Sequence, residues 1–222
     1  MEVTTGGLFF CKFCNILKRK HILYNSKNRE SVIKMQNQKV IRAQRYLARF
    51  DEILNNMAKE MLSQTVTGSI TIDFIKCMIP HHQAAIYMSQ NLLQYTKYPP
   101  LERIARNIIQ MQTKGIEQMR EIEKTTLWYN NTPRDVNMYI TKYLEITRNM
   151  ITKMRNSTRC ININLNFTSE MIPHHEGAIA MCENLLQYNI DPRLKIVANN
   201  IIYEQSQGVS KLKEVQKSLY RK

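Results

Sequence analysis

The sequence predicts an all-α fold, and three observations support this prediction. The chain has 222 residues, of which 43% are apolar and only 6 are Gly and 6 are Pro, so it can bury a core and contains few helix breakers. Apolar residues recur at helical spacings of three and four, for example at Leu101, Ala105 and Ile108. The third observation is an internal repeat, whereas no stretch alternates with period two for long enough to predict a strand.

The repeat has an offset of 93 residues. Residues 78–95 return as residues 171–188, with 13 of 18 positions identical, which chance does not produce. The same offset, without a gap, pairs Pro99 with Pro192. The sequence therefore contains one structural unit twice.

Each copy is predicted to contain three helices. Their ranges are 36–62, 71–96 and 99–123 in the first copy, and 134–156, 165–189 and 191–219 in the second. Pro99 and Pro192 suit the first turn of a helix, which places the start of the third helix of each copy. Pro80 and Pro173 lie inside the second helix of each copy, and we expect that helix to continue through the proline because one apolar stripe crosses it.

The first 35 residues are predicted to form a basic extension. The helical bundle is predicted to span 36–222, with repeat one at 36–124 and repeat two at 134–219. The net charge is +14, and the first 49 residues hold eleven Lys and Arg against two Glu. A basic arm over residues 1–49 can contact polyanions such as nucleic acid or anionic lipid. We expect residues 1–35 to be dispensable for the fold and the main site.

The chain is expected to work in the cytoplasm. A short apolar patch near its start precedes the basic residues, which is not the order of a secretory signal, and no apolar run is long enough to span a bilayer. Five cysteines, an odd number, suit a reducing compartment. Cys11 and Cys14, with His21 nearby, lack the second pair of a zinc finger. They are interpreted as free thiols, with a thiol copper site or a redox pair as alternatives.

The strongest candidate site is the Met-Ile-Pro-His-His segment of each copy. On a helix, His81 and His82 lie on either side of the core-facing stripe, between Met78 and Met88. Two adjacent half-buried imidazoles are costly to desolvate without partners. Metal coordination satisfies both rings and is therefore favoured over simple packing.

The repeat extends this candidate site to further side chains. The second copy of the His and Met set is His174, His175, Met171 and Met181. Two i, i+4 pairs at equivalent positions are candidates for extra sulfur ligands: Met57 with Met61, and Met150 with Met154. The two motif helices could face each other and share one central site, which we favour, or they could lie apart and form two sites.

The donor types indicate a soft metal ion. Thioether sulfur with imidazole favours Cu(I), and also Ag(I), over Mg, Ca or Mn. Zinc stays possible if Glu176 joins the histidines of the second copy. Copper is thus the predicted ion, with silver or zinc as alternatives.

These motifs resemble a bacterial family labelled domain of unknown function 305, whose hallmark is a Met-(Ile/Met)-Pro-His-His-(Gln/Glu)-(Gly/Ala)-Ala motif. A later helix of that family has a Gln and a Met spaced like Gln112 and Met119. The resemblance implies a ferritin-like four-helix bundle from residues 71–96, 99–123, 165–189 and 191–219, with added helices before each half. It also implies copper binding and copper resistance, which at least one member achieves with Met and His. The sequence departs from the family at Gly115 and Gly208, where Glu is common, and at Leu212, the counterpart of Met119.

Three functions follow from these features. The favoured one is a non-catalytic copper buffer or resistance factor. A helical interaction protein with a polyanion-binding arm is the first alternative, and it predicts salt-sensitive binding. A ferritin-like dinuclear metal oxidase is the second, but such sites need Glu-x-x-His on two helices, and the sequence contains no Glu-x-x-His.

Overall fold

The computed structural model describes residues 26–126 and 130–221, and these residues form an all-α fold. The helices are α1 (Ser26–Leu62), α2 (Ile70–Leu93), α3 (Pro99–Thr125), α4 (Pro133–Arg155), α5 (Ile163–Leu185) and α6 (Pro192–Tyr220). The described residues contain no strand. The predicted fold class is therefore confirmed. No helix in this part of the chain is long and apolar enough to cross a membrane.

The chain divides into two units, residues 1–41 and residues 42–222. In the first unit the described residues belong to the N-terminal part of α1, and side chains 32–41 are exposed. This helix begins ten residues before the predicted position 36. The additional residues include Lys, Arg and Glu, which favour helix without an apolar face to bury. The candidate thiols Cys11 and Cys14 lie outside the described residues.

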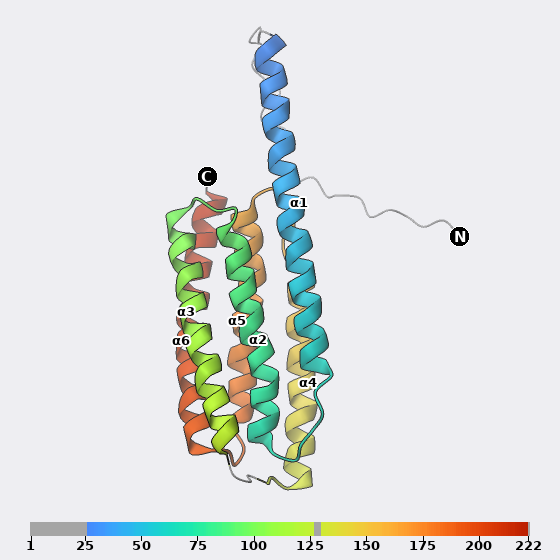
Figure 1. Cartoon of the computed structure of the whole chain (residues 1–222), viewed down its shortest axis with the longest axis vertical. Helices are drawn as coiled ribbons and strands as arrows, with labels where there is room; N and C mark the ends of the chain where they lie inside the picture. The colour runs from blue at the N-terminus through green and yellow to red at the C-terminus, as the bar shows by residue number, and fades with distance from the viewer. Residues whose placement is uncertain (1–25, 127–129, 222) are drawn as a thin grey trace, which may run out of the picture. The chain divides into compact units, whose positions relative to one another are not determined.

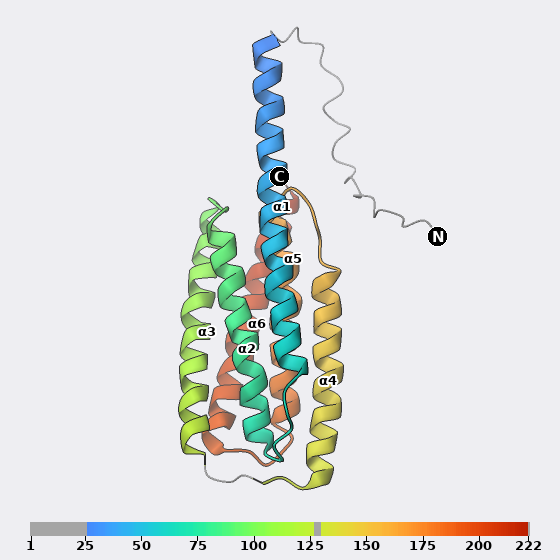
Figure 2. The same cartoon turned by 45° about the vertical axis from the view of Figure 1, so that its right-hand side comes forward.

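The second unit consists of three pairs of helices (Figure 1). The central pair is α2 with α5, which carry the two Pro-His-His segments and run antiparallel. The pair α3 and α6 covers one side of it. The other side is covered by α4 together with residues 42–62 of α1, as the turned view also shows (Figure 2). The Pro-His-His segments thus lie between two outer layers.

The two halves of this unit make equivalent contacts at the offset of the sequence repeat. The Asn91 side chain donates to the Tyr46 carbonyl at 3.0 Å, and Asn184 donates to the Tyr139 carbonyl at 3.2 Å. The Tyr46 and Tyr95 rings meet edge to face at 5.9 Å, and the equivalent rings of the second half do so at 5.7 Å. The repeat therefore folds as an internal pseudo-twofold pair.

The central helices continue through their prolines, as predicted. Pro80 lies inside α2 and Pro173 lies inside α5. The N-terminus of α5 is capped by the Asn162 side chain, which accepts from the backbone of residues 164 and 165 and satisfies two otherwise unpaired amides. Each histidine pair therefore directly follows an internal proline, where one backbone hydrogen bond of the helix cannot form.

Candidate metal centre

His81 of α2 and His174 of α5 meet between the two central helices. Their ring centroids are 3.8 Å apart, their planes differ by 31°, and neither residue has exposed surface. His174 Nε2 lies 3.2 Å from the His81 carbonyl oxygen. Because a carbonyl only accepts, His174 donates from Nε2 and carries its lone pair on Nδ1. The two motif helices therefore face each other, which is the arrangement favoured from the sequence.

His82 and His175 point from this centre toward the outer pair of helices. A side-chain carbon built at Gly115 of α3 would lie 3.0 Å from His82 Nε2, and one built at Gly208 of α6 would lie 2.9 Å from His175 Nε2. Such distances are too short for an undisturbed contact. The two glycines therefore leave room for the imidazoles.

The four imidazoles are neutral at pH 7. Burial lowers the pKa of His81 to about 4 and that of His175 to about 3. Burial also holds the pKa of His82 and His174 well below the usual value of 6.5. A neutral imidazole has a lone pair, and this is the form that binds a metal ion.

Most of the nitrogens of these rings have no hydrogen-bond partner. Both ring nitrogens of His81 are enclosed and unpaired, as is Nδ1 of His82, His174 and His175. An unpaired buried polar group costs about 1–3 kcal/mol. Coordination of an ion would remove this cost at several nitrogens at once.

Methionine sulfur is abundant in the same core. All eight candidate methionines are at most 2% exposed and belong to one continuous cluster: Met57, Met61, Met78, Met88, Met150, Met154, Met171 and Met181. The Met150 sulfur of α4 fills the space that a side chain at Gly177 of α5 would take. Gly177 lies three residues after His174, so a thioether of α4 packs within one turn of the central imidazoles.

Glu176 does not face the histidines. Its Oε1 accepts from Lys213 Nζ at 2.8 Å, and its side chain is 39% exposed. The alternative in which Glu176 joins the second histidine pair to bind zinc is therefore not supported by this geometry. Successive residues of a helix point about 100° apart. Because the neighbouring His175 is buried, the side chain of Glu176 points away from it.

Sequence reasoning gave Gln112 and Gln205 no role in the site. Both amide oxygens are buried and have no hydrogen-bond partner. Each residue lies one turn before the glycine that contacts a histidine ring. The sequence did contain a signal for these residues, because the same polar residue, Gln, recurs at the repeat offset on a core-facing stripe.

A second missed feature has no counterpart in the repeat. Glu170 of α5 is fully buried and accepts a hydrogen bond from the Tyr46 hydroxyl at 2.5 Å. Burial raises the pKa of Glu170 to about 8. The equivalent residue in α2 is Cys77, whose thiol is also buried. The repeat could not reveal this carboxyl group, because it is not repeated.

The donor set restricts the ion that this centre fits. Among residues 26–126 and 130–221, no three His, Cys, Asp or Glu side chains are grouped to hold one ion. The buried core offers Met sulfur as a further donor type in addition to the imidazole nitrogens. Thioether ligands contribute affinity for soft ions only. The core therefore contains the imidazole and thioether donors that a soft ion such as Cu(I) prefers.

Comparison with known proteins agrees with the repeat. The family model "Domain of unknown function (DUF305)" matches residues 20–123 and 143–220. The chain belongs to this family. The DUF305 match falls in two segments that correspond to the two halves of the sequence repeat. A search of curated proteins finds no match.

A solved structure also resembles this DUF305 protein. It is described as CopM in the Cu(II)-bound form, with 25% sequence identity and a TM-score of 0.50. The similarity covers 68% of this chain and 97% of that one. The similar region is therefore nearly the whole of the CopM chain.

Proposed function

We propose that this DUF305 protein binds Cu(I) between α2 and α5 through Met and His side chains, and that it acts in the cytoplasm as a copper buffer or resistance factor. The observation that carries the proposal is the buried contact of His81 with His174. Three of the four nitrogens of these two rings lack partners, in a core rich in thioether sulfur. Four neutral imidazoles are available as ligands. No catalytic step is needed for this function.

The similarity to Cu(II)-bound CopM supports copper as the metal. The thioethers add a preference for the reduced ion, because Cu(I) is softer than Cu(II). Silver(I) has the same preference and should occupy the same site. Zinc gains little from thioethers, and the one carboxylate expected to help it points to the surface.

A competition titration tests this proposal. The reduced full-length protein is titrated with Cu(I), Ag(I) and Zn(II), each against a chelator of known affinity. We expect Cu(I) and Ag(I) to bind far more tightly than Zn(II), because only soft ions use the sulfur ligands. A tighter affinity for Zn(II) than for Cu(I) would show that the methionines are not ligands.

The two glycines beside the histidines provide a second test. Alanine usually stabilises a helix interior by about 1 kcal/mol relative to glycine. In Gly208→Ala the new carbon would lie 2.6 Å from His175 Cδ2, so the ring must move. We expect Cu(I) affinity to fall roughly 10–100-fold, as when a metal ligand loses its orientation.

Ser210→Ala is the control for this variant, because residue 210 is an exposed position on the same helix. It should leave the Cu(I) affinity unchanged. If Gly208→Ala raised the melting temperature and kept the wild-type affinity, the position of His175 would be irrelevant to the metal.

A further inference from the structure

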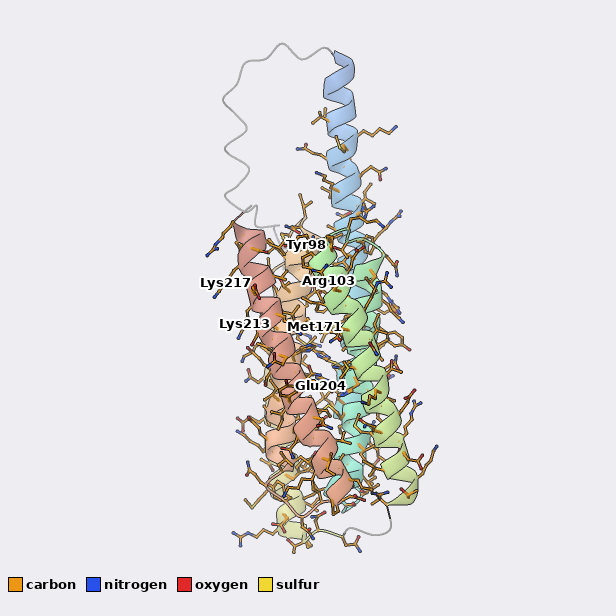
Figure 3. All side chains as sticks on the ribbon, turned by 90° about the vertical axis from the view of Figure 1, so that its left-hand side faces the viewer. Tyr98, Arg103, Met171, Glu204, Lys213 and Lys217 are labelled. Atoms are coloured by element: carbon orange, nitrogen blue, oxygen red, sulfur yellow. The ribbon has the colours of Figure 1, made fainter. Side chains whose placement is uncertain are left out.

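A cleft of about 850 Å³ lies between α3 and α6. Figure 3 views the molecule from this side, with Arg103 on α3 and Glu204 on α6 labelled. The volume falls within the range of small-molecule sites, and it is far larger than a single ion needs, since one water takes about 30 Å³.

The buried part of the cleft lining is polar and unsatisfied. Gln112 and Gln205 line it at 3% and 4% exposure, and neither amide oxygen has a partner. His175 also lines the cleft, and so does Gly208, over which its ring lies. His175 is the one histidine among the lining residues. The cleft therefore leads from the surface to one end of the proposed metal centre.

The outer part of the lining carries both signs of charge. Arg103 and Lys211 supply two cations, and Glu204 and Glu214 supply two carboxylates. None of the four forms an ion pair within 4 Å of another described residue, although Lys114 interacts electrostatically with Glu204. A balanced rim gives a bare cation no net attraction, whereas it can pair with a ligand that has both ammonium and carboxylate groups.

We propose that the α3–α6 cleft binds a small zwitterionic thiol, of the amino-acid or short-peptide class, that carries Cu(I) as a thiolate complex, and that the copper passes from it to His175. In this exchange a copper–sulfur bond breaks and a copper–nitrogen bond to His175 forms. The released thiolate takes a proton from water, and copper stays Cu(I) throughout. The carboxylates of the carrier pair with Arg103 and Lys211, and its ammonium group pairs with the glutamates.

This inference rests on the proposed function, because the carrier delivers its ion to the copper centre proposed above. It adds the source of the ion and the side from which the ion arrives. His81 and His174 have no exposed surface, so an ion can reach them only through neighbouring ligands. His175 supplies such a ligand at the inner end of the cleft.

The test measures the rate of copper transfer by rapid mixing. Preformed Cu(I)–glutathione is mixed with the full-length protein, and the loss of thiolate-to-copper absorbance is followed. The variant is Arg103→Glu with Lys211→Glu, which reverses both rim cations. The matched control is Arg148→Glu with Lys153→Glu, an equal charge change at exposed positions of α4. The equilibrium Cu(I) affinity of each protein is measured separately.

We expect transfer to the rim variant to be at least roughly tenfold slower than to the control, in line with the size of local electrostatic steering. Both variants should keep the wild-type affinity, because neither changes a proposed ligand. Equal transfer rates in two variants that both bind Cu(I) tightly would overturn the cleft proposal and leave the proposed function standing. If the wild-type protein failed to bind Cu(I) at all, both proposals would fall.

Discussion

The His81→Ala/His82→Ala variant is expected to lose tight Cu(I) binding almost completely, although the second histidine pair is intact. His81 stacks on His174 at 3.8 Å, so removal of the first pair also removes the neighbour of the second. Loss of the orientation of a ligand alone costs about 10–100-fold in affinity, and loss of two ligands should cost more. Chelator competition measures both the affinity and the number of ions bound.

The number of Cu(I) ions that this variant binds distinguishes three cases. Near-complete loss indicates one shared centre, and retention of about half the copper at unchanged affinity indicates two separate sites. Retention of all the copper would mean that the histidines serve only packing. Leu92→Ala is the matched control, because it removes a fully buried side chain of α2 ten residues from His82 and should weaken folding without removing a ligand.

The metal-free protein is expected to lose stability steeply as the pH falls below about 6.5. The four histidines have a folded-state pKa below their ordinary value, so the unfolded chain binds protons more readily than the folded one. Their contribution to stability is full above pH 6.5 and is lost as the pH falls toward the folded values, which are about 4 for His81 and about 3 for His175. At about 1.4 kcal/mol per pKa unit, His81 alone contributes on the order of 3 kcal/mol. Denaturant unfolding followed by circular dichroism at several pH values measures this loss.

Ionisation of Glu170 should make the stability of the protein depend on pH in the opposite direction. Its pKa is raised from 4.5 to about 8, so its contribution is full below pH 4.5 and is lost as the pH rises through 8. Glu170→Gln should therefore remove a loss of stability that runs from about pH 4.5 to 8, so the decline that the histidines cause below pH 6.5 should become steeper. A metal-free Glu170→Gln variant that is equally stable at pH 4 and pH 7 would contradict neutral, buried histidines.

The repeat made most of the fold predictable. Identical spacing in the two copies defined the second and third helices of each half, and the stripe across Pro80 and Pro173 indicated helices that continue through them. The start of α1 was placed too late, because apolar periodicity marks buried helix and residues 32–41 are exposed. The part of α1 before residue 36 is accounted for by the helix propensity of its residues, without burial of an apolar face.

The candidate site was predictable in its residue types and less so in its contacts. The recurrence of His81 and His82 as His174 and His175 indicated the candidate ligands, but spacing along one helix could not decide whether the two copies meet. The Tyr46–Glu170 contact joins residues 124 apart in sequence and has no repeated counterpart. Such a contact follows from the packing of α1 against α5, which periodicity does not encode.

X-ray absorption at the copper K-edge tests the central claim most directly. The measurement uses reduced wild-type protein loaded with less than one equivalent of Cu(I), so that the tightest site fills first. Coordination by thioether and imidazole predicts a Cu(I) edge with both sulfur and nitrogen neighbours. A first shell with only nitrogen and oxygen, or only sulfur, would contradict a centre built from Met and His together.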